Sequence, residues 1–395
     1  MLGEHVSLLD LIGDEPRPLR VAMLAPPWIT VPPPGYGGIE SVVELLSEQL
    51  VVRGHDVTLF AAPGSSSPAR VRPLLESAQP RSIGSALFES DHVASAFDAI
   101  DEAAAGGEPF DVIHDHSGFC ALSMAARAAA PVVHTLHTAL TTDIARFYER
   151  HAHKAQIVAI SRSQAQSAPL AVRVAAVVPN PVVVDRWPFC ADKDDYLLWV
   201  GRMDPVKGPH RAIEAAQIAG RRLVLAGPVQ KGQETFFRTF VEPHVDGDRV
   251  RYFGPVAGRA KQQLFARAAA LLMPIRWAEP FGMVMIEAHA CGTPVISFRE
   301  GAAREIVIDG LNGMLVADER DMAQATTRLA SIDPRACRQS ARRRYDAGIV
   351  ARDYEAVYRR AIARGRPGGT QGAGPAASHR RTSEPRPRLG TAVRV

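Results

Sequence analysis

The stretch from Glu279 to Ile296, EPFGMVMIEAHACGTPVI, constrains the fold more than any other part of this chain. It follows a run of small apolar residues, Ala268 to Met273, which is typical of a buried strand. The Pro-Phe-Gly after Glu279 predicts a loop, because proline bars a continuing helix and glycine frees the backbone. Met283 to Cys291 then predicts a helix, which a glycine and a proline end before a second strand, Val295 to Phe298. The segment therefore predicts one strand–helix–strand unit of a parallel α/β sheet.

This unit predicts a binding site at the start of its helix. Ligands of open α/β sheets bind beyond the carboxyl ends of the strands, and the free amides and positive dipole end of a helix suit a diphosphate. Two carboxylates flank that end, since Glu279 lies in the loop and Glu287 lies about one turn inside the helix. Because a carboxylate accepts hydrogen bonds from sugar hydroxyls, the pair favours a nucleotide sugar. The alternative is that both acids only cap or solvate the helix.

The two acids form a Glu-x7-Glu pattern, with Pro-Phe-Gly after Glu279 and Ala-x-Ala-x-Gly-x-Pro after Glu287. The pattern resembles the retaining glycosyltransferases of family 4, and the resemblance spans roughly residues 19 to 362. It implies the GT-B fold, an α/β architecture in which two Rossmann-like, doubly wound domains face a cleft. It also implies that Glu287 holds the ribose of the donor and that Glu279 holds a hydroxyl of the donor sugar. The amides around Phe281 and Gly282 would contact the phosphates.

A second loop carries two cations, Arg202 and Lys207, in the sequence Gly-Arg-x4-Lys-Gly. It lies between a predicted strand, Tyr196 to Val200, and a predicted helix, Pro209 to Ala219. Charged hydrogen bonds to phosphate are stronger than neutral ones, so the pair suits a diphosphate. We expect both residues to bind the donor and to stabilise the charge that builds on the leaving diphosphate, which is a catalytic role. A solvated surface pair is the alternative.

The N-terminal half opens with a strand–helix–strand unit as well, and Gly37 and Gly38 lie at the N-terminus of its predicted helix. The predicted strands are Leu19 to Ala25 and His55 to Ala61, with the helix Ile39 to Arg53 between them. Amides freed by two glycines can approach a phosphate closely, although the glycines could instead only permit a tight turn. The resemblance implies contact with the donor phosphates. Strands that alternate with helices throughout predict mostly parallel, doubly wound sheets.

Four histidines lie in or just after two further predicted strands: His114, His116, His134 and His137. Their spacing would allow a metal site, but they lie at the ends of separate strands with few carboxylates nearby. The resemblance implies instead that His137 contacts the donor sugar or phosphate and acts in catalysis. It also suggests that His116 faces the acceptor, while His134 is structural. Two cations and a helix end can do what a metal does elsewhere, so we expect no metal and no cofactor besides the donor substrate.

The positive charge of the chain is concentrated at its C-terminal end. The sequence pI is near 9.0 and the net charge is +4, but residues 366–395 alone carry six Arg and one Glu, a net of +5. The remainder comes to −1, so no nucleic-acid partner is expected. This Gly-, Pro-, Ser- and Arg-rich tail has too few aliphatic residues for a core, and it predicts disorder. Contact with an anionic membrane or another polyanion is the alternative to a solvated tail.

Length and composition predict two globular domains in a reducing compartment. A chain of 395 residues exceeds one typical core, and 46% of its residues are apolar. No apolar run approaches the roughly 20 residues of a membrane span, and the N-terminus lacks the layout of a signal peptide. The four scattered cysteines form no CxxC pair, so reduced thiols are expected. We therefore predict a cytoplasmic protein, with peripheral contact at the inner face of the membrane left open.

These observations predict a leader (1–18), an N-terminal acceptor domain (19–188), a C-terminal donor domain (189–345), a helix that crosses back (346–365) and the tail (366–395). The predicted reaction moves a sugar from a nucleoside diphosphate sugar, of the UDP or GDP type, to a hydroxyl of a glycan, glycolipid or small molecule, with retention of configuration. A non-catalytic sugar-nucleotide-binding protein and a GT-B epimerase remain alternatives. A phosphorylase is not supported, because no segment resembles a lysine site for pyridoxal phosphate. The sequence does not indicate the acceptor or the oligomeric state.

Overall fold

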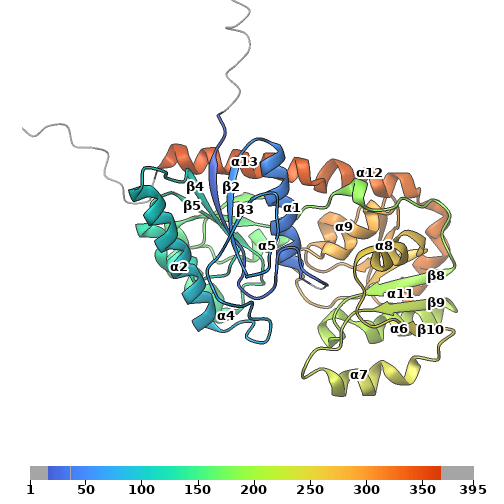
Figure 1. Ribbon diagram of the computed structural model, residues 1–395. Helices are drawn as coiled ribbons and strands as arrows, with labels where there is room; N and C mark the ends of the chain where they lie inside the picture. Colours follow the sequence, from blue (N-terminus) through green and yellow to red (C-terminus); the bar gives the residue numbers. More distant parts are fainter. Residues whose placement is uncertain (1–16, 36, 366–395) are drawn as a thin grey trace, which may run out of the picture.

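The computed structural model describes residues 17–35 and 37–365, which form two domains, each built on a parallel sheet (Figure 1). In this part of the chain the N-terminal sheet has seven strands in the order β3-β2-β1-β4-β5-β6-β7, and each adjacent pair is parallel. The strands are β1 (Arg20–Leu24), β2 (Asp56–Ala61), β3 (Arg70–Pro73), β4 (Val112–Asp115), β5 (Val132–Leu136), β6 (Gln156–Ala159) and β7 (Val174–Val177).

The C-terminal sheet repeats this order over the six strands that the structure describes, β10-β9-β8-β11-β12-β13, again all parallel. In each sheet the first strand, β1 or β8, lies between the second and the fourth, so the strand order reverses there. This reversal is the switch point at which open α/β sheets bind ligands. The strands are β8 (Tyr196–Val200), β9 (Arg222–Ala226), β10 (Val250–Tyr252), β11 (Ala270–Met273), β12 (Val295–Phe298) and β13 (Gly313–Val316).

Helices cover both faces of the N-terminal sheet, because successive residues of its strands point to opposite faces and both sets are apolar. One buried cluster joins the sheet to α1 and α13, and another joins the opposite face to α2, α3 and α4. The helices of this domain are α1 (Gly38–Val52), α2 (Ala86–Ala105), α3 (Ala121–Met124), α4 (Thr142–His151) and α5 (Arg162–Ser167), with the 3-10 helices η2 (Ala125–Arg127), η3 (Ala152–Lys154) and η4 (Val184–Arg186).

The C-terminal sheet is covered in the same way. One buried cluster joins it to α6 and α11, and another joins its opposite face to α8, α9 and α10. The helices are α6 (Pro209–Ala219), α7 (Glu234–Phe240), α8 (Gly258–Arg267), α9 (Met283–Ala290), α10 (Ala303–Ile306), α11 (Glu319–Ala325) and α12 (Pro334–Tyr345), with the 3-10 helices η5 (Pro205–Lys207), η6 (Glu242–His244) and η7 (Thr326–Ser331).

The chain crosses between the domains twice, and the two crossings lie side by side. Val182 and Asp346 form a parallel bridge, and the Val182 amide donates to the Tyr345 carbonyl at 2.8 Å. Beyond this point α13 (Ala347–Arg364) runs along the N-terminal domain next to α1 (Figure 1). Its Tyr354 and Tyr358 are buried in that domain. The last helix therefore belongs to the core of the first domain.

The predicted fold class is confirmed, since two Rossmann-like domains with parallel sheets are present. The elements around Glu279 also agree with the prediction: α9 ends one residue earlier than expected, and β11 starts two residues later. In residues 64–108 the sequence pattern indicates only one or two helical pieces, and the structure has β3 and the long helix α2 there. The sequence also did not predict α4, α8 or β13. These elements are short or rich in polar residues, so their hydrophobic pattern is weak.

The predicted basic tail and nearly all of the predicted leader lie outside the residues that the structure describes. The cysteines within the described chain are all free, as expected. Across residues 17–35 and 37–365, no helix combines the length and the apolar composition that crossing a membrane requires.

Candidate functional site

Two loops meet at the switch point of the C-terminal sheet. The loop after β8 carries Lys207, and the loop after β11 carries Glu279. The Lys207 ammonium donates a hydrogen bond to Glu279 Oε2, although the two residues lie 72 positions apart in the chain. Each side chain is only 15% exposed. The structure therefore joins residues of two separate sequence motifs in one ion pair, at the edge of the sheet where a ligand is expected.

Local contacts set the position of Lys207. Asp204 caps the short helix η5, since its Oδ1 accepts the amide hydrogen of Val206 at 2.9 Å. The Trp199 indole donates to the Lys207 carbonyl at 3.1 Å, which ties this helix to strand β8. The ammonium also lies 5.0 Å from the ring centre of Trp277, so a cation–π contact adds to the ion pair. Lys207 is thus held from three sides.

The backbone of Glu279 is held by the loop after β12. The Ala302 amide donates to the Glu279 carbonyl at 3.0 Å. Gly301 makes this close approach possible, because its φ is +50° and a Cβ there would lie 2.4 Å from the Glu279 oxygen. The carboxylate of Glu279 therefore extends from a fixed backbone rather than from a free loop.

Helix α9 begins with backbone amides that no side chain of the described residues caps. Its N-cap is Gly282, with φ +88°, a conformation that other residues rarely adopt. The preceding Phe281 is buried and packs edge-on against Tyr345, with ring centres 5.8 Å apart. The first amides of a helix have no partner inside it and carry the positive end of its dipole. This end of α9 can therefore bind an anion.

Glu287 lies in α9 with its side chain buried. Lys261 of α8 donates to its Oε1 at 2.7 Å. The other oxygen, Oε2, is buried and has no hydrogen-bond partner within the described part of the chain. Leaving a buried acceptor unpaired is costly, so a ligand hydroxyl is its expected partner.

Arg202 lies at the same edge of the sheet but outside the Lys207–Glu279 pair. Its Nη1 donates to Gln230 Oε1 at 2.9 Å, across to the loop after β9. Its Nε is buried and finds no acceptor among the residues described. The guanidinium therefore keeps donors that an anion at this edge could use.

Three histidines form a hydrogen-bonded chain at the ends of β4 and β5. His137 Nε2 contacts His116 Nδ1 at 2.8 Å, and His116 Nε2 contacts His114 Nδ1 at 3.2 Å. His114 in turn contacts the hydroxyl of Tyr358 on α13 at 2.6 Å. Burial lowers the pKa of His137 to about 3 and holds the pKa values of His114 and His116 well below their ordinary range. All three rings are therefore neutral near pH 7.

The other predictions for the histidines have mixed outcomes. His134 is buried between Asp115, at 2.5 Å, and the Tyr148 hydroxyl, at 2.7 Å, which fits a structural role. His116 is 1% exposed and its ring contacts that of His137 at 2.8 Å, so its expected contact with an acceptor stays a prediction. Within the described residues, no group of three or more His, Cys, Asp or Glu side chains could hold a metal ion.

The glycine pair lies where it was predicted, since Gly37 is the N-cap of α1 and Gly38 its first residue. A Cβ on Gly37 would lie 2.6 Å from Pro33 Cβ, so the glycine lets the loop close on the helix. In the first turn Glu40 is buried, and this burial raises its pKa. Among the described residues, no hydrogen bond or ion pair joins the glycine loop or His137 to the predicted site residues of the C-terminal domain, such as Lys207 and Glu279.

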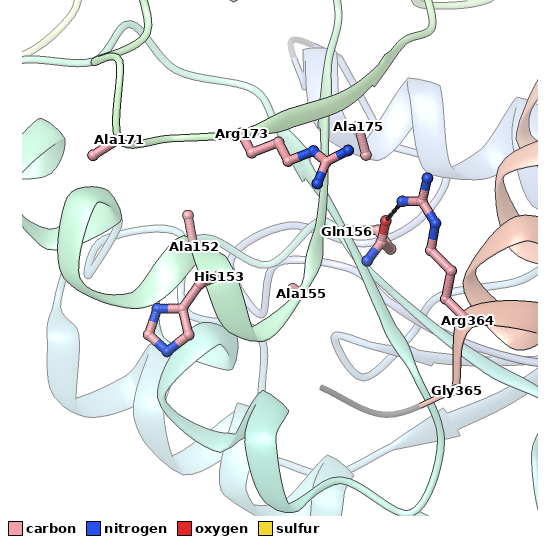
Figure 2. A pocket seen from close by; sticks show the side chains of 9 residues that line it. All are labelled: Ala152, His153, Ala155, Gln156, Ala171, Arg173, Ala175, Arg364 and Gly365. Carbon is pink, nitrogen blue, oxygen red and sulfur yellow. Dashed lines mark hydrogen bonds between the residues drawn. The ribbon is translucent and has the colours of Figure 1, made fainter. Parts of the chain in front are cut away.

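A cavity of about 480 Å³ lies elsewhere, on the N-terminal domain where α13 ends (Figure 2). Arg173, His153 and Arg364 line it, and Arg364 donates to Gln156 at 2.8 Å (Figure 2). None of the predicted site residues lines this cavity. It is therefore not the site that the sequence motifs define.

Comparison with known sequences gives an independent view of the chain. The family described as "Glycosyl transferases group 1" matches residues 187–344, and "Glycosyltransferase Family 4" matches residues 36–186. A D-inositol 3-phosphate glycosyltransferase of Frankia alni is 31% identical over 372 residues, covering 80% of this chain and 90% of that protein. The protein of the same name from Mycolicibacterium smegmatis is 28% identical over 382 residues, covering 83% and 87%.

Comparison with solved structures also finds glycosyltransferases. AviGT4, a glycosyltransferase involved in avilamycin A biosynthesis, has a TM-score of 0.67 and 28% identity, covering 88% of this chain and 98% of that one. Anabaena HepE, solved in complex with UDP and glucose, has a TM-score of 0.66 at 19% identity, covering 87% and 100%. The two parallel-sheet domains and these neighbours place the chain in the GT-B fold class, and the sequence matches make it a glycosyltransferase. The chain belongs to glycosyltransferase family 4.

Sequence reasoning missed Lys261 and Gln230, which contact predicted residues, and Trp187, which contacts Lys261. Lys261 pairs with Glu287, Gln230 contacts Arg202, and the Trp187 ring lies beside the Lys261 ammonium. One signal could have pointed to Lys261: only five of the 46 Lys and Arg residues are lysines. Each lysine in so arginine-rich a chain is a candidate for a position that needs a compact ammonium.

Proposed function

We propose that this glycosyltransferase is a retaining enzyme that takes its sugar from a nucleoside diphosphate sugar bound by the C-terminal domain. The observation that carries the proposal is the Lys207–Glu279 ion pair beside the uncapped start of α9. Cation, helix end and carboxylate lie together at the switch point, where a diphosphate and a sugar hydroxyl would need them. The acceptor hydroxyl would come from the side of the N-terminal domain.

Each group has a defined task in this reaction. Lys207 and Arg202 bind the diphosphate together with the first amides of α9, and they stabilise its charge as the bond to the sugar breaks. When the diphosphate binds, Lys207 exchanges its carboxylate partner for a phosphate. Glu279 is then free to accept a hydrogen bond from the sugar, and Glu287 holds the ribose through Oε2.

Retention follows if the acceptor attacks from the face that the diphosphate leaves. A diphosphate oxygen then accepts the proton of the acceptor hydroxyl, so no protein nucleophile is required. His137, neutral at neutral pH, contacts the donor sugar or phosphate from the N-terminal domain as a hydrogen-bonding group rather than as a cation. With cations and a helix end at the diphosphate, the reaction proceeds without a metal ion.

The base of the donor nucleotide and the acceptor have to be identified by assay. UDP and GDP sugars are the first donors to assay, and the UDP bound to Anabaena HepE supports starting with UDP. The relatives named above support D-inositol 3-phosphate as the first acceptor to assay, beside other hydroxyl compounds. We propose a cytoplasmic location for the reaction.

The test is a turnover assay with the anomeric configuration read from the product. The purified protein is incubated with UDP- and GDP-sugars and each acceptor, with and without EDTA, and the product is analysed by proton NMR. We expect a glycoside with the anomeric configuration of the donor, formed equally well with EDTA. An inverted product would overturn retention, and activity lost in EDTA and restored by manganese would overturn metal independence. Donor binding without any product or epimer would favour the non-catalytic alternative.

A further inference from the structure

The carboxylate of Glu287 is held on one side only. Lys261 Nζ lies 2.7 Å from Oε1, while Oε2 is buried without a partner among the described residues. The Glu287 side chain is 10% exposed and that of Lys261 is 27% exposed. A carboxylate so deeply buried would be strongly unfavourable without a nearby cation. Lys261 is therefore the group that allows Glu287 to be present here as an acceptor.

Lys261 is itself held in a fixed place. It lies in the first half of α8, and its ammonium is 5.6 Å from the ring centre of Trp187 and 5.8 Å from that of Phe265. These two rings pack edge to face with their centres 5.7 Å apart. Contacts with two aromatic faces leave the ammonium little freedom to move away from Glu287. The position of Oε1, and with it the direction of Oε2, is thus set before any ligand binds.

We propose that Lys261 is a positioning residue for the donor ribose: by holding Oε1 of Glu287, it directs Oε2 toward the ribose hydroxyls and gives the enzyme its preference for ribose over deoxyribose. This inference rests on the proposed function and deepens it. A freely rotating carboxylate could accept from any nearby donor, whereas one fixed oxygen favours a hydroxyl at one place. A buried acceptor left unpaired by a deoxy ligand then penalises that ligand.

The alternative is an ion pair that only stabilises the packing of α8 against α9. Such a pair would affect the melting temperature, but it would leave the difference between ribose and deoxyribose ligands unchanged. The two readings are therefore separated by ligand pairs that differ only in the hydroxyls.

The experiment measures dissociation constants by calorimetry for UDP and 2′,3′-dideoxy-UDP, with a parallel series for GDP. Wild type is compared with Lys261→Met, Lys261→Arg and Glu287→Gln, at a temperature well below the melting point of each. Arg267→Met is the matched control, because Arg267 lies on the same helix and its ion pair with Asp194 is exposed and does not involve Glu287.

Lys261→Met is expected to weaken binding of the ribose ligand about tenfold, as for the loss of a charged hydrogen bond. It should change binding of the dideoxy ligand by only about twofold or less, because that ligand does not use the fixed oxygen. In the Glu287→Gln background, adding Lys261→Met should have little further effect on ribose preference. Lys261→Arg keeps a cation and should retain more of the preference than Lys261→Met. Arg267→Met should match wild type with both ligands.

The result that overturns the inference is a Lys261→Met protein that folds and keeps the ribose preference of wild type. If Lys261→Met does not fold, Lys261→Gln takes its place, because it also removes the cation but keeps a polar side chain. A Lys261→Gln protein with the ribose preference of wild type contradicts the inference in the same way. Wild type that binds neither UDP nor GDP would instead contradict the proposed function, and the inference would fail with it.

Discussion

Two of the five lysines in this chain donate to the two glutamates of the Glu-x7-Glu pattern. A third, Lys193, is enclosed by the carbonyls of Ala266 and Cys291 and by the Thr293 hydroxyl, and burial lowers its pKa to about 8. A lysine presents three donors around one compact charge, whereas an arginine needs a planar arrangement of acceptors. At Lys193 the three acceptors surround one point, so arginine would not replace this lysine without loss.

The two glutamates should affect different kinetic constants. Glu287 would grip the ribose, which does not change during the reaction, so Glu287→Gln should raise the donor KM about tenfold with kcat nearly unchanged. Glu279 would lie near the sugar that gains positive charge, so Glu279→Gln should lower kcat about tenfold or more. Steady-state kinetics on both variants measures this. The opposite assignment would show that the roles are reversed, and unchanged kinetics in both would make the pair structural.

Most residues of the candidate site could be predicted, because they lie in two dense local motifs. Lys207 and Glu279 were each placed at the end of a strand, and the structure joins them. Lys261 could not be predicted in this way, since it lies 26 residues before Glu287 on a polar helix that the sequence pattern did not indicate. Contacts between elements that carry no motif depend on tertiary packing, which periodicity does not encode.

At the level of elements, the ends of β4 and β5 hold buried neutral histidines. Burial lowers the pKa of His137 to about 3 and holds those of His114 and His116 well below their usual 6.5. Between the folded and the unfolded pKa values, the unfolded chain binds protons that the folded chain cannot. The free energy of unfolding is therefore greatest, with respect to these groups, above pH 6.5, and it falls as the pH drops below that value.

His116→Asn should reduce this dependence on pH. Each histidine that is protonated only on unfolding contributes a slope of about 1.4 kcal/mol per pH unit below its unfolded pKa. The variant should be less stable than wild type at neutral pH, because His114 and His137 lose a partner, but the gap should narrow as the pH falls from about 6.5 to about 5. Denaturant unfolding at several pH values measures both slopes. Equal slopes in the two proteins would show that His116 takes up its proton in the folded state as well.

The elements themselves differed in how clearly the sequence indicated them. The unit β11–α9–β12 could be predicted because its strands are almost wholly apolar and a glycine lies at each end of the helix. In contrast, β3 (Arg70–Pro73) is an exposed edge strand with alternating arginines, and half of the residues of α8 have charged or amide side chains. An edge strand buries little, so tertiary pairing rather than its own pattern decides that it forms.

At the scale of the whole molecule, one carboxylate joins the two domains at the start of a helix. Glu305 of the C-terminal domain accepts the backbone amide hydrogens of Arg162 and Ser163, at 3.1 and 3.0 Å, where α5 of the N-terminal domain begins. A negative charge at a helix start is favourable, and here it comes from the other domain. Together with the paired crossings at Val182 and Asp346, this contact links the two domains.

Glu305→Gln should loosen this contact without changing donor affinity. The residues proposed to bind the donor tightly lie in the C-terminal domain, so the dissociation constant for the nucleoside diphosphate should remain within about twofold of wild type. Turnover requires both domains, so kcat should fall several-fold, because the neutral amide oxygen of glutamine accepts more weakly than a carboxylate. Glu319→Gln is the control, because Glu319 pairs with Arg211 inside one domain. A fall in affinity as large as the fall in kcat would show that Glu305 acts on the donor site directly.

The central claim is that a diphosphate binds between Lys207 and the start of α9, and titration of UDP and GDP into Lys207→Met tests it most directly. Lys154→Met, which removes a lysine of the N-terminal domain, is the control. Lys207→Met with Glu279→Gln shows how much of any loss comes from the carboxylate left without its partner. We predict that Lys207→Met weakens nucleoside diphosphate binding about ten- to a hundredfold, that the double variant recovers only part of this, and that the control binds as wild type does. An unchanged dissociation constant in a folded Lys207→Met protein would contradict the account.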